Sequence, residues 1–232
     1  MSSLDPSLEK TIDNIFQVGF KHHQEGRLSD AHAAYDQILA LNPHHFDALH
    51  LSGLIAAQTG QANMAVDYIK KALQINAADP SAHKNLGIAL HSLECYEEAI
   101  DSYRRALSME PNDPEAFYNI GNAYLARSIF DEAIASYEKA IGLAPSHSNA
   151  HLNLGIALYE LGHSELAIAS YDLAITLDPS FSEAFFSRGL ALEGLKQLDA
   201  ALVDYDRTLI FNPAHQEAKQ HRENLLRALG RI

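Results

Sequence analysis

The chain has one cysteine, no tryptophan and no apolar run long enough to cross a membrane. Cys95 alone cannot close an intrachain disulfide, and zinc sites built from paired cysteines are excluded. A membrane-spanning helix needs about 20 consecutive apolar residues. The first ten residues, MSSLDPSLEK, lack the basic start and apolar stretch of a signal peptide. These absences favour a cytoplasmic protein without disulfides or a membrane partner.

Positive charge is scarce as well, since 30 acidic residues stand against 17 basic ones and the formal net charge is −13. Nucleic-acid binding begins with lysine and arginine clustered on one face, and the sequence shows no such cluster. We therefore expect no nucleic-acid partner. The acidic surface either serves solubility alone or also attracts basic partners.

The hexapeptide NLGIAL stands at residues 85–90 and again at 153–158, and its relative NIGNAY stands halfway, at 119–124. This spacing defines a period of 34 residues, which several residue types follow. The recurring glycines are Gly19, Gly53, Gly87, Gly121, Gly155 and Gly189, and the alanines that follow them are Ala31, Ala65, Ala99, Ala133, Ala167 and Ala201. Next come Tyr35, Ile69, Tyr103, Tyr137, Tyr171 and Tyr205, and then Pro43, Ala77, Pro111, Pro145, Pro179 and Pro213.

Each unit is predicted to hold two helices, because apolar residues recur at spacings of three and four, as at Leu86, Leu90 and Leu93. The glycines and alanines let facing helices approach closely, and the tyrosine fills the remaining space. Proline then ends the second helix. Between the helices, we expect left-handed residues at Gly26, Gly60 and Gly162 and helix caps at Ser29, Asn63 and Asp131.

The two ends of the chain differ from the repeated units. Residues 1–11 are predicted to lead into and lengthen the first helix, which we expect to run from about Ser7 to Glu25. Residues 216–232 are predicted to form a capping helix that keeps leucines for packing and turns Arg222 and Glu223 outward. A terminal polar cap is what a stack of repeats needs for solubility.

The 34-residue unit, with xxLGxxY followed by A, Y or F, A and P, resembles the tetratricopeptide repeat family. The resemblance implies an all-α, right-handed α-solenoid of six tandem repeats plus the C-terminal capping helix. The repeats are 12–45, 46–79, 80–113, 114–147, 148–181 and 182–215. Ser52 and Arg188 depart from the usual leucine, and the usual early tryptophan is replaced by Ile15, Leu49, His83, Phe117, His151 and Phe185. We expect Ser52 and Arg188 to loosen the second and sixth units.

No catalytic motif stands in the sequence, which lacks GxSxG, the phosphate-binding GxxxxGK[ST], HExxH and the EF-hand pattern. We therefore expect no enzymatic activity and no cofactor. The 13 histidines raise a metal hypothesis, especially His22/His23, His44/His45 and the pair His147 and His151. Several fall at turns between repeats or replace the early aromatic residue, so packing and turn roles are favoured over metal ligation.

Helical geometry gathers positions 2, 6, 9 and 13 of each first helix into one stripe opposite its packed face. The resemblance implies that this stripe lines a concave groove that binds extended or helical peptides. Position six carries Asn85, Asn119 and Asn153, a candidate ladder whose amides could pair with a peptide backbone. Alternatively, these asparagines satisfy a neighbouring turn or a water. The flanking candidates are Lys84, Tyr118, Asn122 and Tyr159.

Position two carries acidic residues such as Asp47 and Glu115, whereas repeats that clamp acidic chaperone tails carry lysine and arginine at positions two and six. The asparagines are similar to those in the superhelical repeat region of O-linked N-acetylglucosamine transferases. We predict a non-catalytic protein–protein interaction scaffold, monomeric, that binds a neutral or basic peptide. One alternative is a recognition or regulatory region of a larger enzyme such as a glycosyltransferase. Another is a self-assembling solenoid, suggested by Phe16, Phe20, Leu54, Ile88, Ile156 and Leu190.

Overall fold

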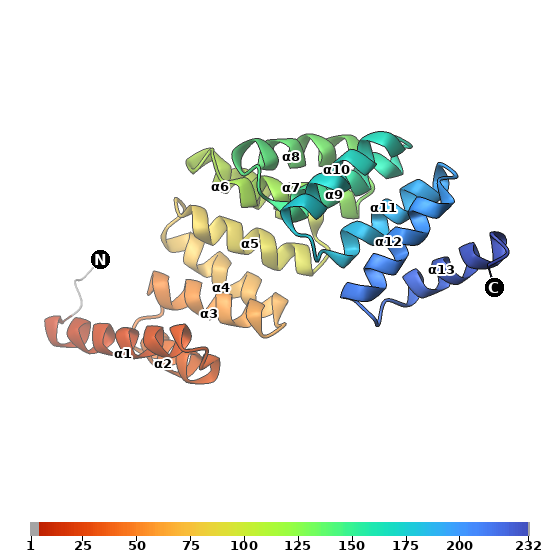
Figure 1. Ribbon diagram of the computed structural model, residues 1–232. Helices are drawn as coiled ribbons and strands as arrows, with labels where there is room; N and C mark the ends of the chain where they lie inside the picture. Colours follow the sequence, from red (N-terminus) through yellow and green to blue (C-terminus); the bar gives the residue numbers. More distant parts are fainter. Residues whose placement is uncertain (1–4, 232) are drawn as a thin grey trace. The chain divides into compact units, whose positions relative to one another are not determined.

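The computed structural model describes residues 5–231, and all regular secondary structure in this range is helical (Figure 1). The helices are α1 (Pro6–Gln24), α2 (Leu28–Leu41), α3 (Phe46–Gln58), α4 (Ala62–Ile75), α5 (Pro80–Ser92), α6 (Tyr96–Met109), α7 (Pro114–Ala126), α8 (Phe130–Leu143), α9 (Ser148–Glu160), α10 (Ser164–Leu177), α11 (Ser182–Gly194), α12 (Leu198–Phe211) and α13 (Gln216–Ala228). The predicted all-helical repeat fold is confirmed.

The helices fall into two compact units, Met1–Pro111 with α1–α6 and Asn112–Ile232 with α7–α13. In the first unit, α1 packs on α2, α3 on α4 and α5 on α6, and successive pairs meet through α2 with α3 and α4 with α5. The second unit repeats this scheme, and α13 packs on α12. Each helix pair thus covers the apolar face that its neighbour leaves open, as stacked repeats require.

The turn inside each helix pair contains one left-handed residue. Gly26, Gly60 and Gly162 adopt φ values of 74°, 76° and 82°, as predicted. The other three pairs place a residue with a Cβ at the same position, with φ values of 60°, 57° and 63° at Glu94, Ser128 and Lys196, respectively. Glycine takes this conformation without steric cost, whereas the other residues hold it against a local penalty.

The predicted caps of the second helices are wrong. These helices begin at Leu28, Ala62 and Phe130, directly after the left-handed residue and its successor. Each predicted cap, Ser29, Asn63 or Asp131, is therefore the second residue of its helix. The cap positions themselves hold residues whose side chains make no capping hydrogen bond. Acidic residues in the first turn, such as Asp131, still favour the positive end of the helix dipole.

The last residue of the preceding repeat caps α3, α5, α7, α9 and α13, whereas Phe181 before α11 makes no side-chain capping hydrogen bond. The Nδ1 atoms of His45, His147 and His215 accept hydrogen bonds from backbone N–H groups at 3.2, 3.2 and 3.3 Å. Asp79 and Asp113 do the same through carboxylates. A histidine that accepts through Nδ1 carries its proton on Nε2 and is neutral. Three of the 13 histidines that raised the metal hypothesis therefore cap the N-termini of helices.

The core of five repeats is a glycine on the first helix against a tyrosine ring on the second, and repeat 46–79 has Gly53 against Ile69 instead. A Cβ at Gly87, Gly121 or Gly155 would lie 2.5 Å from a ring carbon of the tyrosine 16 residues later. These rings are among the largest fully buried side chains, which include Tyr35, Tyr103, Tyr137, Tyr171 and Tyr205. Burial raises the pKa of every one of these phenols, and that of Tyr35 to about 12.

Ser52 and Arg188, which replace the usual leucine of the repeat, have different surroundings. Ser52 is fully buried, and its hydroxyl has no hydrogen-bond partner among the described residues. Arg188 donates to both carboxylate oxygens of Asp204 at 2.8 and 2.7 Å and also to Asp172. Arg188 therefore ties α11 to α10 and α12, where the sequence predicted a looser repeat.

The ends of the chain are held locally. At α1, the Asp5 carboxylate accepts from the backbone N–H of Ser7 at 3.1 Å, and the helix begins at Pro6. In α13, Leu225 packs with Leu192, Ala201 and Tyr205. The predicted lead-in and capping segments extend to residues 1–4 and 232, which lie outside the described residues.

Candidate functional site

The asparagines at position six of the predicted stripe are half-buried, whereas stripe positions two and 13 are exposed. In the first unit, Asn85 on α5 donates through Nδ2 to His50 Nε2 on α3 at 2.9 Å. Lys84 lies beside it and is half-buried too. His50 accepts as a neutral ring, with its proton on Nδ1. The Asn85 amide thus joins two successive repeats, which differs from the free amide that the sequence led us to expect.

In the second unit, three of the predicted residues form one hydrogen-bonded cluster. Asn153 on α9 donates through Nδ2 to Asn122 Oδ1 at 2.9 Å and to Tyr118 Oη at 3.3 Å, both on α7. The buried hydroxyl of Tyr137 on α8 also donates to Asn122 Oδ1, at 2.9 Å. We call Tyr118, Asn122, Tyr137 and Asn153 the Asn153 cluster. Its hydrogen bonds fix the side chains before any ligand arrives.

Asn119 behaves differently from the other two asparagines of the predicted ladder. Its side chain is half-buried on α7 and has no hydrogen-bond partner within residues 5–231. Tyr159 on α9 is half-buried as well, and a Cβ at Gly194 would lie 3.8 Å from its hydroxyl. Asn119 is therefore the amide with its full hydrogen-bonding capacity unused, next to the ordered Asn153 cluster.

His50 and Tyr137, the partners of these asparagines, were not among the predicted site residues. A signal for His50 exists in the sequence, because His50 and Asn85 are 35 residues apart, as are Tyr118 and Asn153. One period plus one residue places position five of one first helix against position six of the next. The role of Tyr137 required the structure, since the period alone marks it as a core residue.

A second polar cluster, not predicted, lies near the end of the second unit. Glu193 Oε2 on α11 accepts from the Tyr205 hydroxyl at 2.6 Å and lies 3.0 Å from His221 Nδ1 on α13. The Phe186 ring packs 4.4 Å from the His215 ring and 5.9 Å from that of His221, measured between centroids. Glu193 adds negative charge beside an aromatic surface.

No group of three or more His, Cys, Asp or Glu residues within 5–231 lies close enough together to hold a metal ion. No helix in the described part of the chain is long and apolar enough to cross a membrane.

Acidification should destabilise the first unit at His50. Burial lowers the pKa of His50, and the carboxylates of Asp79 and Asp47 only partly oppose this. The unfolded chain therefore binds the proton first, near pH 6.5, and the stability present above that pH falls as the pH drops toward the folded pKa.

His50→Gln tests this because glutamine also offers an acceptor to Asn85 but does not titrate. Urea unfolding at about pH 7 and about pH 5 should show a larger loss for the wild-type chain, by less than about 1 kcal/mol. Equal losses in the two proteins would show that His50 does not contribute to the pH dependence.

Comparison with known proteins places this architecture in a family. The family model described as Tetratricopeptide repeat matches residues 24–83, 118–180 and 152–217, and one described as TPR repeat matches residues 89–128. The chain belongs to the tetratricopeptide repeat family. It is accordingly a repeat scaffold of the protein-interaction type. No curated protein matches its sequence.

Solved structures share the fold. PilF of Pseudomonas aeruginosa matches with a TM-score of 0.78 at 19% identity, covering 94% of this chain and 99% of that one. A MamA structure matches with a TM-score of 0.68 at 25% identity, over 74% and 94% of the two chains. YrrB, described as a TPR protein with an unusual peptide-binding site, matches with a TM-score of 0.66 at 19% identity, over 82% and 98%.

Proposed function

We propose that this chain is a non-catalytic scaffold that binds a peptide segment of a partner protein along the stripe of its first helices. The observation that carries the proposal is the unpartnered amide of Asn119 beside the ordered Asn153 cluster. An amide both donates and accepts, so Asn119 can pair with the C=O and N–H of a peptide backbone. YrrB, which shares the fold, is described as having a peptide-binding site.

The Asn153 cluster supports binding through preorganisation. Its hydrogen bonds hold Tyr118 and Asn122 in place, which reduces the entropy lost when a ligand orders an interface. The acidic residues at position two, including Glu115 and Glu183, are exposed and favour a neutral or basic peptide over an acidic one. Hydrogen bonds to the peptide backbone would supply affinity, and the carboxylates at position two would supply selectivity.

The experiment uses peptides selected on the wild-type chain from a random-peptide display library. Asn119→Ala should weaken their binding about threefold to tenfold without changing stability, because it removes one unsatisfied amide. Changing Asn119 and Asn153 of the second unit together to alanine should weaken binding about fivefold to a hundredfold, at about 0.5–1.5 kcal/mol per hydrogen bond. Asn85→Ala tests the stripe of the first unit separately, and circular dichroism would check the fold, since Asn85 and Asn153 also bond within the chain.

A matched triple variant changes Gln37, Asn63 and Glu138 to alanine, since all three are exposed residues of second helices. It should bind the selected peptides like the wild-type chain. The proposal is wrong if these outward changes abolish binding while the asparagine variants retain it.

Self-association is a second candidate, favoured by two apolar residues at stripe position nine. Phe20 is 38% exposed and Ile88 is 41% exposed. Exposed apolar side chains promote contact between copies when they are contiguous. Sedimentation over a range of concentrations would test this, and a mass that stays at 25.5 kDa would exclude it.

A further inference from the structure

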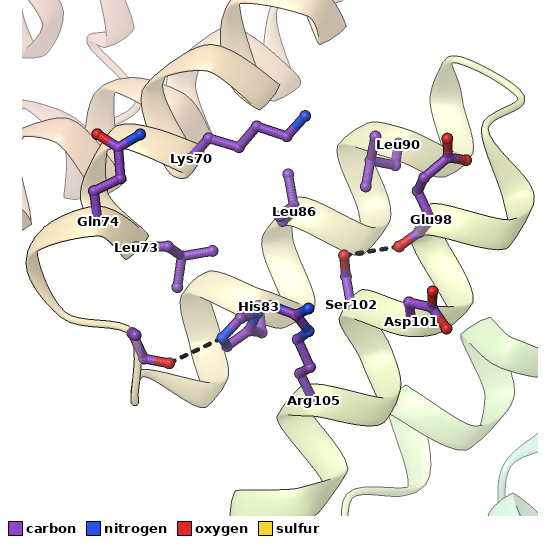
Figure 2. Close-up of a pocket in the computed structure, with 11 residues that line it drawn as sticks. Lys70, Leu73, Gln74, His83, Leu86, Leu90, Glu98, Asp101, Ser102 and Arg105 are labelled. Atoms are coloured by element: carbon purple, nitrogen blue, oxygen red, sulfur yellow. Dashed lines mark hydrogen bonds between the residues drawn. The ribbon is translucent and has the colours of Figure 1, made fainter.

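A cavity of about 400 Å³ opens in the first unit, away from the stripe (Figure 2). Leu86 and Leu90 of α5 form its floor together with the ring of His83, and α4 and α6 form its walls. At about 100° per residue, His83 and Leu90 lie about 160° and about 140° around α5 from Asn85, and Leu86 lies about 100° from it, so all three point away from the stripe. Binding in this cavity would therefore be separate from binding along the stripe.

The floor of the cavity is apolar and held in place. Leu86 and Leu90 are buried on α5, and Leu73 adds a half-buried apolar side chain from α4. The His83 ring is 5% exposed, and its Nε2 lies 3.0 Å from the backbone oxygen of Ala77. A carbonyl only accepts, so Nε2 carries the proton and the ring is fixed.

The rim of the cavity carries two cations, Lys70 and Arg105, and two carboxylates, Glu98 and Asp101. Lys70 stands on the α4 wall and Arg105 on the α6 wall. Neither has an ion-pair partner in the described part of the chain, while Asp101 is paired with Arg104 at 3.8 Å. Glu98, in the first turn of α6, lies at the Leu90 end of the cavity, toward which the Lys70 side chain also extends, whereas Arg105 stands at the His83 end (Figure 2).

The second unit shows how the chain fills the equivalent place itself. There Asp172, Arg188 and Asp204 occupy the repeat positions that Lys70, Leu86 and Ser102 occupy in the first unit. Arg188 reaches both carboxylates, and its neighbours are Leu192 and Val203. In the first unit Lys70 replaces Asp172 and the neutral Ser102 replaces Asp204, and Leu86 supplies no charge in place of Arg188.

We propose that this cavity binds a carboxylate attached to an apolar group, with the carboxylate between Lys70 and Arg105 and the apolar group on the leucines. Two cations suit a single negative charge, and guanidinium–carboxylate pairs are strong and directional. A phosphate, with a charge near −2, fits less well because Glu98 shares the rim. A free N-acylated amino acid and the C-terminal residue of a peptide carry the same chemistry.

The His151 position serves as an internal comparison. His151 repeats the His83 geometry, with Nε2 3.0 Å from the backbone oxygen of Pro145. However, Glu138 and Leu173 stand at the repeat positions of Lys70 and Arg105. The buried histidine is therefore present at both positions, whereas Lys70 and Arg105 are present only at the cavity of the first unit. These two cations are the residues to test.

The test measures fluorescence anisotropy of a labelled Gly-Ser-Gly-Ser-Leu peptide on the full chain, as the free acid and as the C-terminal amide. The free acid should bind saturably and the amide at least about tenfold more weakly, because the amide lacks the charge that Lys70 and Arg105 hold. Lys70→Gln combined with Arg105→Gln should weaken binding of the free acid by at least about the same factor.

Lys71→Gln is the matched control, because Lys71 neighbours Lys70 but lies over the Tyr68 ring, and it should leave binding unchanged. Displacement of the peptide by N-acetyl-leucine would assign the cavity to free acids, and failure to displace it would assign the cavity to chain ends. The proposal is overturned if the acid and amide bind equally, if neither binds, or if the double variant binds like the wild type. Asn119→Ala should leave this binding intact, which separates it from the function proposed for the stripe.

Discussion

Replacing Gly121 with leucine should lower the free energy of unfolding by at least about 3 kcal/mol, at the upper end of overpacking effects. A Cβ at this position would lie 2.5, 2.7 and 2.9 Å from three carbons of the Tyr137 ring. That ring is fully buried, and its hydroxyl is bonded to Asn122, so it cannot move aside cheaply. Urea unfolding followed by circular dichroism would measure the loss.

The chain offers a matched control in Gly142, which is exposed near the end of α8 and has nothing within 4 Å of an added Cβ. Gly142→Leu should be neutral or stabilise by up to about 1 kcal/mol, because leucine is the better helix former. If both variants unfolded at the wild-type midpoint, the glycine–tyrosine contact would not limit packing in the second unit.

Deleting residues 216–232 should cause aggregation or unfolding from the C-terminal end. The deletion removes Leu225, which is 3% exposed, and uncovers Tyr205 and Leu192 beneath it. Loss of a buried leucine alone costs about 2–5 kcal/mol. Light scattering would report aggregation, and hydrogen exchange should show faster exchange in α12 than in the rest of the second unit.

A point-variant pair separates packing from charge in this cap. Leu225→Ala should reproduce part of the loss, whereas changing Glu223 and Arg227 to alanine should shift stability by no more than about 0.5 kcal/mol, because that ion pair is exposed. A truncated chain as soluble and cooperative as the full one would show that α13 is not needed as a cap.

The fold could be predicted because periodicity and packing give the same answer. Gly121 and Tyr137 recur with the 34-residue period because each repeat must solve the same contact, and the repeat fold follows from that. The turn conformation was predicted only where glycine marks it. Glu94 and Lys196 take the same left-handed conformation, but nothing in their own identity indicates it.

The candidate site could be predicted only in position. Helical geometry placed Asn85, Asn119 and Asn153 on the first-helix stripe, but not their hydrogen bonds. Whether an asparagine is free depends on the residue one period plus one earlier, which is His50 for Asn85 and Tyr118 for Asn153. The cavity beside Lys70 was not predicted, since it depends on which side chains leave space unfilled between three helices.

The buried tyrosines are intrinsic spectroscopic probes of folding in this protein. The chain has no tryptophan, and five of its six repeats each bury one tyrosine at the same repeat position. The buried tyrosines therefore contribute near-ultraviolet signals from five repeats, alongside the five other tyrosines of the chain, while repeat 46–79 has Ile69 in that place. The same rings set an alkaline limit. Their stabilisation is complete below about pH 10 and is lost as the pH rises through the raised pKa values, so tyrosinate absorbance at high pH should appear together with unfolding.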